Sequence, residues 1–415
     1  MSRPAPATAP IADDIYKKMA VAATVFAVIF EAGYLATSAA PYDGLGYLIG
    51  RDFVNTWMGA RSALAGGPAS WFDFDTYNAV LAAQFYPEFP HHNWSYPPHL
   101  LLMTWPLAFL PYLPGYLVWC AIGMAVYLLA ASDGGRRKER LYMLAVAPAV
   151  WMNIFAGQNG FLTSALMSAG LAQLGRRPIL SGICFGLLTI KPQLGLLLPL
   201  MLVLTGQWRA IAAAVVTTAA LVVATGLLFG FDIWPQYVRM ALPVQSEILT
   251  QGQGIFTMMM PTVFMNARIA HLPLDVAWAL QGAASLAAVA AVVWTYWRRR
   301  DPVLSVALFV TATFLVTPYA FNYDMVVFGW VIALLHEQGG EPLDDRLAMA
   351  VWTLPITAML LGLFGIPGSA AVLAAFAVRL LWQLKTGDAA RPARSGGGAA
   401  AAAGHPAIPG AIPAA

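Results

Sequence analysis

Residues 50–61, with the sequence GRDFVNTWMGAR, place an aspartate, two arginines, a tryptophan and an asparagine just after the first long apolar segment. The spacing predicts a short helix over 54–64 that begins soon after Asp52. Two interpretations of Asp52 follow from this position. It is either a catalytic base at the mouth of a bilayer-embedded protein, or the carboxylate that caps the helix N-terminus, a common use of aspartate.

The composition around this stretch is that of a membrane protein. Of 415 residues, 59% are hydrophobic and 10% are charged, and the mean hydropathy is +0.66. Because so few polar residues cannot cover a soluble globule, we expect an all-α polytopic membrane protein. The net charge of +3 is dispersed, so nucleic acid is not an expected partner, whereas membrane lipids are. Cys120 and Cys184 lie in apolar runs and are interpreted as core residues.

Basic residues set the predicted orientation. The polar arm 1–18 carries Lys17 and Lys18, and the positive-inside rule places it in the cytoplasm. The apolar run 19–40 that follows is long enough to form the first span. Later basic clusters, at 136–140, 176–177, 209, 298–300 and 385–394, each follow an even number of plausible crossings. The predicted location is the inner (plasma) membrane, with a multi-pass topology.

Outside the membrane we expect a large first loop, 42–97, and a second segment, 231–273. The apolar stretch 98–132 is interrupted by prolines, so one full span preceded by a short dipping helix is expected. Further spans are predicted at 141–155, 161–174, 179–190, 194–205, 210–230 and 276–297, with four more behind them. The membrane domain, 19–385, then has about twelve crossings. The tail 386–415 is rich in Ala, Gly and Pro and is predicted to be disordered.

Lys191 lies between two apolar runs, next to Pro192 and Gln193. A charged side chain at mid-bilayer costs about 3 kcal/mol, so Lys191 is expected to face a cavity or a ligand such as an anionic lipid phosphate. In the alternative, Pro192 ends the span and lets the lysine reach the headgroups.

Two other polar groups interrupt apolar sequence. Gln158 and Asn159 lie in AGQNG, which is either a plain polar turn or part of a site, because the amides both donate and accept hydrogen bonds. Asn322 and Asp324 follow Pro318 near the start of a late span. An aspartate there needs a partner or a function, or it is an N-terminal helix residue favoured by the macrodipole.

The run HHNWSYPP begins with His91 and His92 and contains Tyr96. Adjacent histidines do not share a helical face, so no metal site is expected there. An aromatic and proline loop at the membrane interface is the simpler interpretation. Arg239, Arg268 and His271 in the second external segment are further candidates for contact with a phosphate.

Several short motifs, taken in order, indicate a family. The chain resembles glycosyltransferase family 87, the integral-membrane mannosyltransferase-like group of the GT-C superfamily, over about 19–384. The matching features are an Asp-Phe pair with a following Arg and Gly-Gly, a Tyr-Pro-Pro, a Gly-Gln-Asn, a Lys-Pro and a late Thr-Pro: Asp52, Phe53, Arg61, Gly66, Gly67, Tyr96, Pro97, Pro98, Gly157, Gln158, Asn159, Lys191, Pro192, Thr317 and Pro318.

The resemblance implies a GT-C-type fold and a metal-independent, inverting transfer without a cofactor. A mannose-like hexose would move from a polyprenyl phosphate carrier to a lipid or glycan hydroxyl, at a site facing the periplasm or exterior. The family's first-loop base falls on Asp52. The family's late His after Thr-Pro is missing here, so Asp324 or Asn322 is a candidate substitute. The residues expected to bind substrate are Arg51, Arg61, His91, His92, Tyr96, Gln158, Asn159, Lys191, Gln193, Asn322 and Asp324.

The chemistry suits these residues. A carboxylate that takes the proton of an acceptor hydroxyl typically accelerates transfer by about 10²–10⁴. Lys191 or an external Arg would stabilise the leaving phosphate, and Arg51 or Arg61 would pair with Asp52. The competing interpretation is a transporter or flippase of a lipid-linked sugar, and a non-catalytic assembly partner is a third. The gathering of candidate groups on one face favours the enzyme over the transporter.

Overall fold

The computed structural model describes residues 18, 22, 25–26, 29–135, 138–298, 300–338 and 342–389. Within these ranges the chain is helical, with isolated bridges but no β-strand, as expected for an all-α membrane protein. The predicted arm 1–18 apart from Lys18, much of the first half of the predicted first span, and residues 390–415 of the predicted tail lie outside the described residues. The last helix continues to Ala389, a few residues beyond the predicted start of the tail.

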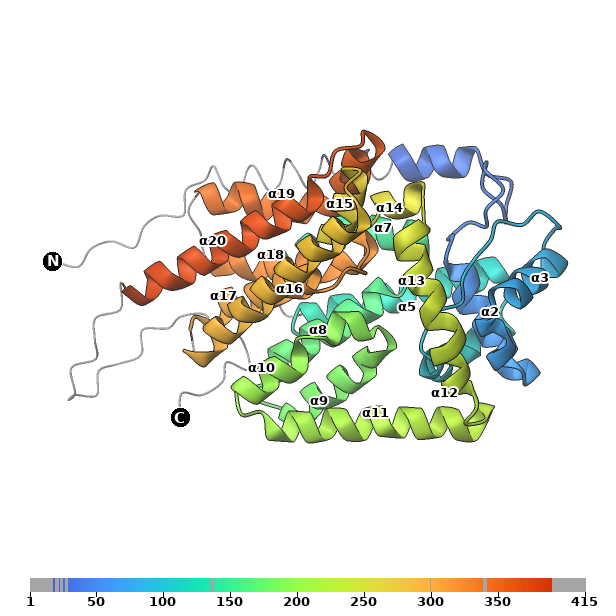
Figure 1. The fold of residues 1–415 in the computed structure, drawn as a ribbon, viewed down its shortest axis with the longest axis horizontal. Coiled ribbons are helices and arrows are strands. Elements are labelled where there is room, and N and C mark those ends of the chain that lie inside the picture. The colour runs from blue at the N-terminus through green and yellow to red at the C-terminus, as the bar shows by residue number, and fades with distance from the viewer. Residues whose placement is uncertain are drawn as a thin grey trace.

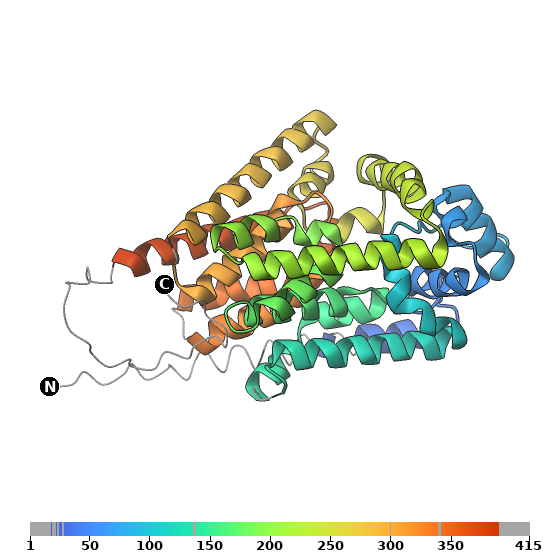
Figure 2. The ribbon, with the colours of Figure 1, turned by 90° about the horizontal axis from the view of Figure 1, so that it is seen from below.

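The long helices run mainly along the longest axis of the molecule (Figure 1, Figure 2). Among the described residues, four helices are long and apolar enough to cross a membrane, and the predicted total of about twelve crossings stays a prediction. The principal helices of the bundle are α5 (Tyr112–Ala131), α8 (Gly160–Gln173), α9 (Pro178–Leu187), α11 (Trp208–Phe229), α16 (Leu274–Trp297), α17 (Pro302–Val316), α18 (Val326–Gln338), α19 (Pro342–Leu363) and α20 (Ser369–Ala389).

Prolines divide several apolar stretches into short helices. The predicted span 141–155 is two helices, α6 (Lys138–Ala145) and α7 (Pro148–Ala156), because Pro148 starts a new helix and holds Ala147 in an extended conformation. Before α5, the stretch 98–109 forms only short helical segments, as expected from its prolines: η2 (Pro98–Leu100), α4 (Leu101–Thr104) and η3 (Trp105–Phe109). Short elements later in the bundle are η4 (Leu188–Ile190), η5 (Pro192–Gly195), α10 (Leu198–Leu204) and η7 (Asn322–Met325).

The two predicted external segments pack against each other at one end of the bundle, where α2, α3 and α13 gather (Figure 1). The ring centroids of Phe72 and Tyr237 are 5.5 Å apart, and Gln245 Nε2 donates to the Ser95 carbonyl at 2.7 Å. Trp94 is buried in the hydrophobic cluster that these two segments share, so its side chain is packed inside the protein rather than exposed at the membrane interface. The elements are α2 (Phe53–Ala65), η1 (Pro68–Phe72), α3 (Phe74–Gln84), α12 (Ile233–Gln236), the π-helical η6 (Tyr237–Ala241), α13 (Leu242–Gln251), α14 (Ile255–Met258) and α15 (Val263–Ile269).

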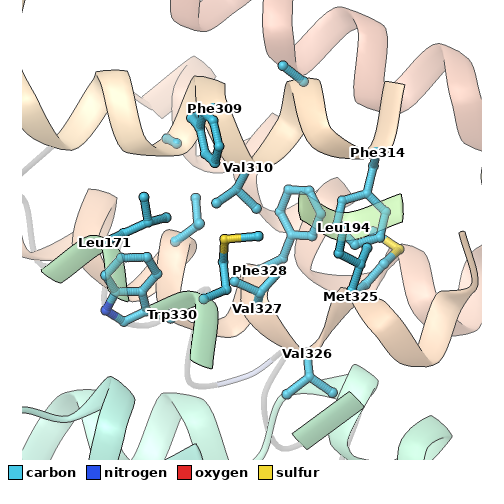
Figure 3. Packing of buried hydrophobic residues seen from close by; sticks show 14 of the residues in the cluster. Leu171, Leu194, Phe309, Val310, Phe314, Met325, Val326, Val327, Phe328 and Trp330 are labelled. Atoms are coloured by element: carbon cyan, nitrogen blue, oxygen red, sulfur yellow. The ribbon is translucent and has the colours of Figure 1, made fainter. Parts of the chain in front are cut away.

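The main core lies between α8, α17 and α18, which are apolar around much of their circumference. Figure 3 shows Phe309 and Phe314 from α17 in one cluster with Phe328 and Trp330 from α18, and the ring centroids of Phe314 and Phe328 are 5.1 Å apart. Fully burying one such side chain contributes about 1.5–3 kcal/mol when the alternative is water. This packing fixes the position of η7, because α18 follows it directly.

Candidate active site

Asp52 immediately precedes α2 and is half-buried. Its side chain makes no capping hydrogen bond to α2, although its position is that of an N-cap. Its backbone N–H donates to the Ala156 carbonyl at 3.0 Å, which ties the start of α2 to the end of α7. The carboxylate of Asp52 is therefore not used as the helix cap that the sequence allowed.

Gln158 holds the Asp52 carboxylate. Its Nε2 donates to Asp52 Oδ2 at 2.9 Å, and its Oε1 accepts from the Tyr96 hydroxyl at 3.0 Å. This orientation of the amide follows because an ionised carboxylate can only accept. Burial, together with the charge of Asp52, raises the pKa of Tyr96 well above its ordinary value. The phenol therefore keeps its proton and remains a donor at physiological pH.

A second cluster surrounds Lys191. Its Nζ forms an ion pair with Asp324 Oδ1 and donates to Asn159 Oδ1 at 2.9 Å. Lys191 is 5% exposed, Asp324 0% and Asn159 2%, so all three residues are buried. The other oxygen of Asp324 accepts from the Phe321 N–H at 3.1 Å. The Lys191 ammonium group is thus bonded to partners within the protein, and its contact with a ligand or with headgroups stays a prediction.

The turn 157–160 joins the two clusters, because Gln158 contacts Asp52 while its neighbour Asn159 contacts Lys191. Glycines allow this turn to fit. Gly157 has φ 61°, and a Cβ there would lie 2.3 Å from the Gly50 carbonyl oxygen. A Cβ at Gly160 would lie 2.2 Å from the Tyr323 carbonyl oxygen. The turn is therefore wedged between the start of α2 and η7.

Neither predicted arginine pairs with Asp52 among the described residues. Arg51 has φ 41° and its guanidinium bridges to Asp43 at 2.6 Å, over the Tyr47 ring. Arg61 is exposed and lies over the Trp57 ring, 4.7 Å from its centroid. The expected pairing fails because adjacent side chains diverge, and because Arg61 lies about 13 Å further along the helix.

The remaining predicted residues are directed elsewhere by their described contacts. His91 is exposed against the Phe74 ring, whereas His92 is buried and donates from Nδ1 to the Pro90 carbonyl at 2.7 Å. Gln193 is half-buried on η5. Asn322 is fully buried and donates to the Pro355 carbonyl at 2.8 Å. Contact of these side chains with a substrate stays a prediction.

Three residues near the site were missed from the sequence. Burial, with smaller contributions from the charges of Asp52 and Asp324, raises the pKa of Tyr319. The Tyr323 ring lies 4.8 Å from Lys191 Nζ. Asn153 Oδ1 accepts from the Gly160 N–H at 2.8 Å, so it caps α8 and leaves Asn159 for Lys191. Both tyrosines stand in TPYAFNYD beside candidates already chosen, which was the available signal.

The described residues contain no group of three His, Cys, Asp or Glu side chains placed to hold a metal. The polar groups instead combine one half-buried carboxylate, two amides and a buried ion pair. Such a set can hold a carboxylate in a fixed orientation next to a bound hydroxyl, which is the requirement for general base catalysis.

Comparison with known sequences identifies the family. The sequence model of glycosyltransferase family 87 matches residues 94–318, more than half of the chain. The match includes Tyr96, Gln158, Asn159 and Lys191, while Asp52 lies before it and contacts Gln158 within it. No curated protein and no solved structure matches the chain. The chain belongs to glycosyltransferase family 87 and is a membrane glycosyltransferase.

Proposed function

We propose that the protein transfers a mannose-like hexose from a polyprenyl phosphate to a hydroxyl of a lipid or glycan acceptor, with inversion and with Asp52 as the base. The proposed fold is of the GT-C type, and the site opens at the outer face of the plasma membrane. The observation that carries the proposal is the Asp52 carboxylate, which stays half-exposed while Gln158, from a distant segment, fixes one of its oxygens.

The proposed reaction is a single displacement. The acceptor oxygen bonds to the anomeric carbon as the bond from that carbon to the phosphate oxygen breaks. The acceptor proton goes to Asp52, and the polyprenyl phosphate leaves with the electron pair. One displacement inverts the configuration at the anomeric carbon. A correctly placed base supplies about 10²–10⁴ of the rate, with substrate positioning providing more.

The leaving phosphate needs a cation to stabilise its developing charge. The sequence offered Lys191 or an external arginine. The ion pair between Lys191 and Asp324 favours the second source, because the lysine charge is already balanced within the protein. Arg61 on α2 and Arg239 on η6 are the exposed arginines of the two external segments, and they are the proposed candidates.

The experiment compares Asp52→Asn with Asp75→Asn, an exposed aspartate of the same loop on α3. Purified protein in proteoliposomes receives polyprenyl phosphates carrying radiolabelled hexoses, and covalent transfer to an extracted lipid and glycan pool is measured. Asp52→Asn should lose at least about 100-fold in kcat, because the asparagine cannot take a proton. Asp75→Asn should stay within about twofold, because an exposed side chain away from the reacting groups contributes little.

Two outcomes would contradict the proposal. Full activity of Asp52→Asn would remove this residue as the base. Movement of the intact labelled lipid across the vesicle membrane, without any covalent transfer by the wild type, would instead support the transporter or flippase. The family match does not favour that alternative.

A further inference from the structure

We infer that the buried pair of Lys191 and Asp324 positions the turn 157–160, and through it the Asp52 carboxylate, and that it does not bind the donor phosphate. Lys191 and Asp324 are then positioning residues, since they act on the reaction only through Asn159, Gln158 and Asp52. This inference rests on the proposed role of Asp52 as the base.

The first support is the bonding capacity of Lys191. An ammonium group has three N–H donors. Two of these donors are used by Asp324 Oδ1 and Asn159 Oδ1. The centroid of the Tyr323 ring lies 4.8 Å from Nζ. Asp324 is equally committed, since its second oxygen accepts from the Phe321 N–H. The pair therefore has little capacity left for a ligand.

The second support is burial and charge. Asp324 is 0% exposed and Lys191 is 5% exposed, so a phosphate could approach Nζ only if the surrounding core opened. It would also bring negative charge next to the Asp324 carboxylate, which already balances the lysine. Such an arrangement is unfavourable in a region of low dielectric constant.

The third support is the route from Lys191 to Asp52. Asn159 and Gln158 are joined by one peptide unit, so fixing the Asn159 side chain restricts the position of Gln158. The close contacts of Gly157 with Gly50 and of Gly160 with Tyr323 leave this turn little room to shift. Gln158 then occupies Asp52 Oδ2, which leaves Oδ1 as the oxygen that receives the acceptor proton.

The consequence is a specific kinetic signature. Loss of a ligand that binds the phosphate of the bound donor raises the donor KM, whereas loss of a positioning contact lowers kcat. Loss of a cation that stabilises the leaving phosphate would lower kcat too, but only the positioning role allows kcat to recover when Asp324 is neutralised as well. Removing Lys191 alone also leaves the Asp324 charge buried without a partner. Removing both charges together relieves this penalty, because a buried pair costs more to break than to replace.

The experiment is a double-mutant cycle of Lys191→Met and Asp324→Asn in the full-length protein, with donor KM and kcat measured per folded molecule. Lys191→Met should lower kcat by about 50-fold while donor KM changes by less than about threefold. The double variant should recover at least about tenfold of that loss, because interacting residues are strongly non-additive.

The matched control is the Arg140 and Glu337 pair, which also joins segments far apart in the sequence but lies at the other end of the bundle. Arg140→Met and Glu337→Gln, alone and combined, should lower the midpoint of thermal unfolding in detergent. Their kcat per folded molecule should stay within about twofold, since among the described residues this pair makes no contact with the turn 157–160.

A donor KM raised about tenfold in Lys191→Met with kcat preserved, or a lowered kcat that does not recover in the double variant, would overturn the inference and make Lys191 a phosphate ligand. If Lys191→Met does not fold, Asn159→Ala breaks the same contact without stranding a charge at the mutated position, and an unchanged kcat there would also overturn it. Absence of transfer by the wild type would reject the proposed function instead, so the two failures are distinguishable.

Discussion

At each end of the helix bundle, side chains link segments that are far apart in the sequence, and the two ends do this with different kinds of contact. At one end, Asp52 and Lys191 are connected through the side-chain amides of a glycine-flanked turn. At the other end, the Arg140 guanidinium donates to both carboxylate oxygens of Glu337 and to the Ala131 carbonyl. The two ends lie roughly 20–30 Å apart, because α5 and α18 run from the end that holds Asp52 to the end that holds Arg140, at a rise of 1.5 Å per residue.

The two contacts differ in how many carboxylate oxygens they occupy. The forked bonds of Arg140 fix two helices in register, and they satisfy both oxygens of Glu337. The amide of Gln158 bonds only one oxygen of Asp52, so the carboxylate is held in place while its other oxygen stays available. The Arg140 contact is therefore of a kind that stabilises the fold, whereas the Gln158 contact leaves a carboxylate oxygen that could accept a proton.

The largest effect that separates the two ends is expected from a single methyl group. Gly157→Ala adds a Cβ that would lie 2.3 Å from the Gly50 carbonyl oxygen, so the turn must move and kcat should fall by about 100-fold. Gly206 has a similar positive φ, +67°, but nothing lies within 4 Å of its Cβ position. Gly206→Ala should therefore cost only the backbone strain, about 1 kcal/mol of unfolding free energy.

Kinetics and thermal unfolding of these two variants provide the measurement. Equal loss of kcat in both would show that the close approach of Gly157 to Gly50 has no special importance. The unequal loss expected here would locate the catalytic requirement at the turn.

A smaller effect is expected from removing one amide at each end. Gln158→Leu deletes the donor to Asp52 and should lower kcat by about 10–100-fold, since a hydrogen bond to a charged group contributes about 1.5–3 kcal/mol. Steady-state kinetics per folded molecule and thermal unfolding of the same sample provide the measurement.

Gln338→Leu is the matched control, because Gln338 Nε2 donates to Asp301 Oδ1 at 3.3 Å on the exposed surface of the other end. Its kcat should be unchanged within about twofold. A Gln158→Leu variant with a lowered unfolding midpoint but an unchanged kcat would mean that Gln158 supports the fold without acting on Asp52.

The smallest expected effect concerns the pH dependence of stability at the Asp52 end. Burial lowers the pKa of His92, and the nearby Asp52 charge opposes this only in part. As pH falls, His92 therefore takes up a proton in the unfolded chain at a higher pH than in the folded protein. The free energy of unfolding is greatest above about pH 6.5 and decreases as pH falls below that value. His92→Gln should weaken this dependence, whereas His91→Gln, at an exposed residue, should keep it.

Thermal unfolding between pH 7.5 and 5.5 tests this expectation. The wild-type midpoint should drop by roughly 1–2 °C over that range, because about 1 kcal/mol shifts the midpoint by roughly 1 °C in a chain of 415 residues. The same drop in His92→Gln would assign the pH dependence to other groups.

The sequence predicted several individual helices well. The expected helix 54–64 is α2 (Phe53–Ala65), and the expected span 276–297 is α16 (Leu274–Trp297). The stretch 141–155 was predicted as one span because its average hydropathy is high, yet Pro148 divides it. Average hydropathy over a window does not register a backbone that cannot continue as a helix.

For the site, the sequence selected residues better than it selected partners. Asp52, Tyr96, Gln158, Asn159, Lys191 and Asp324 were all chosen, either as polar groups in unusual places or, for Tyr96, from the motif of the family resemblance, and the structure brings them into two connected clusters. Arg51 was expected near Asp52 and instead bridges to Asp43. Tyr319 and Tyr323 were missed, because a tyrosine at a membrane boundary is ordinary and its position near two carboxylates depends on the fold.

The sequence by itself determined that this is a helical membrane protein and that its unusual polar residues stand at chain reversals. Both conclusions depend on the transfer free energy of short local segments, which composition and order define. Only the tertiary structure decided that Gln158 holds Asp52 and that Asp324 neutralises Lys191. These partners are 106 and 133 residues apart, and their pairing depends on helix packing that brings distant turns together.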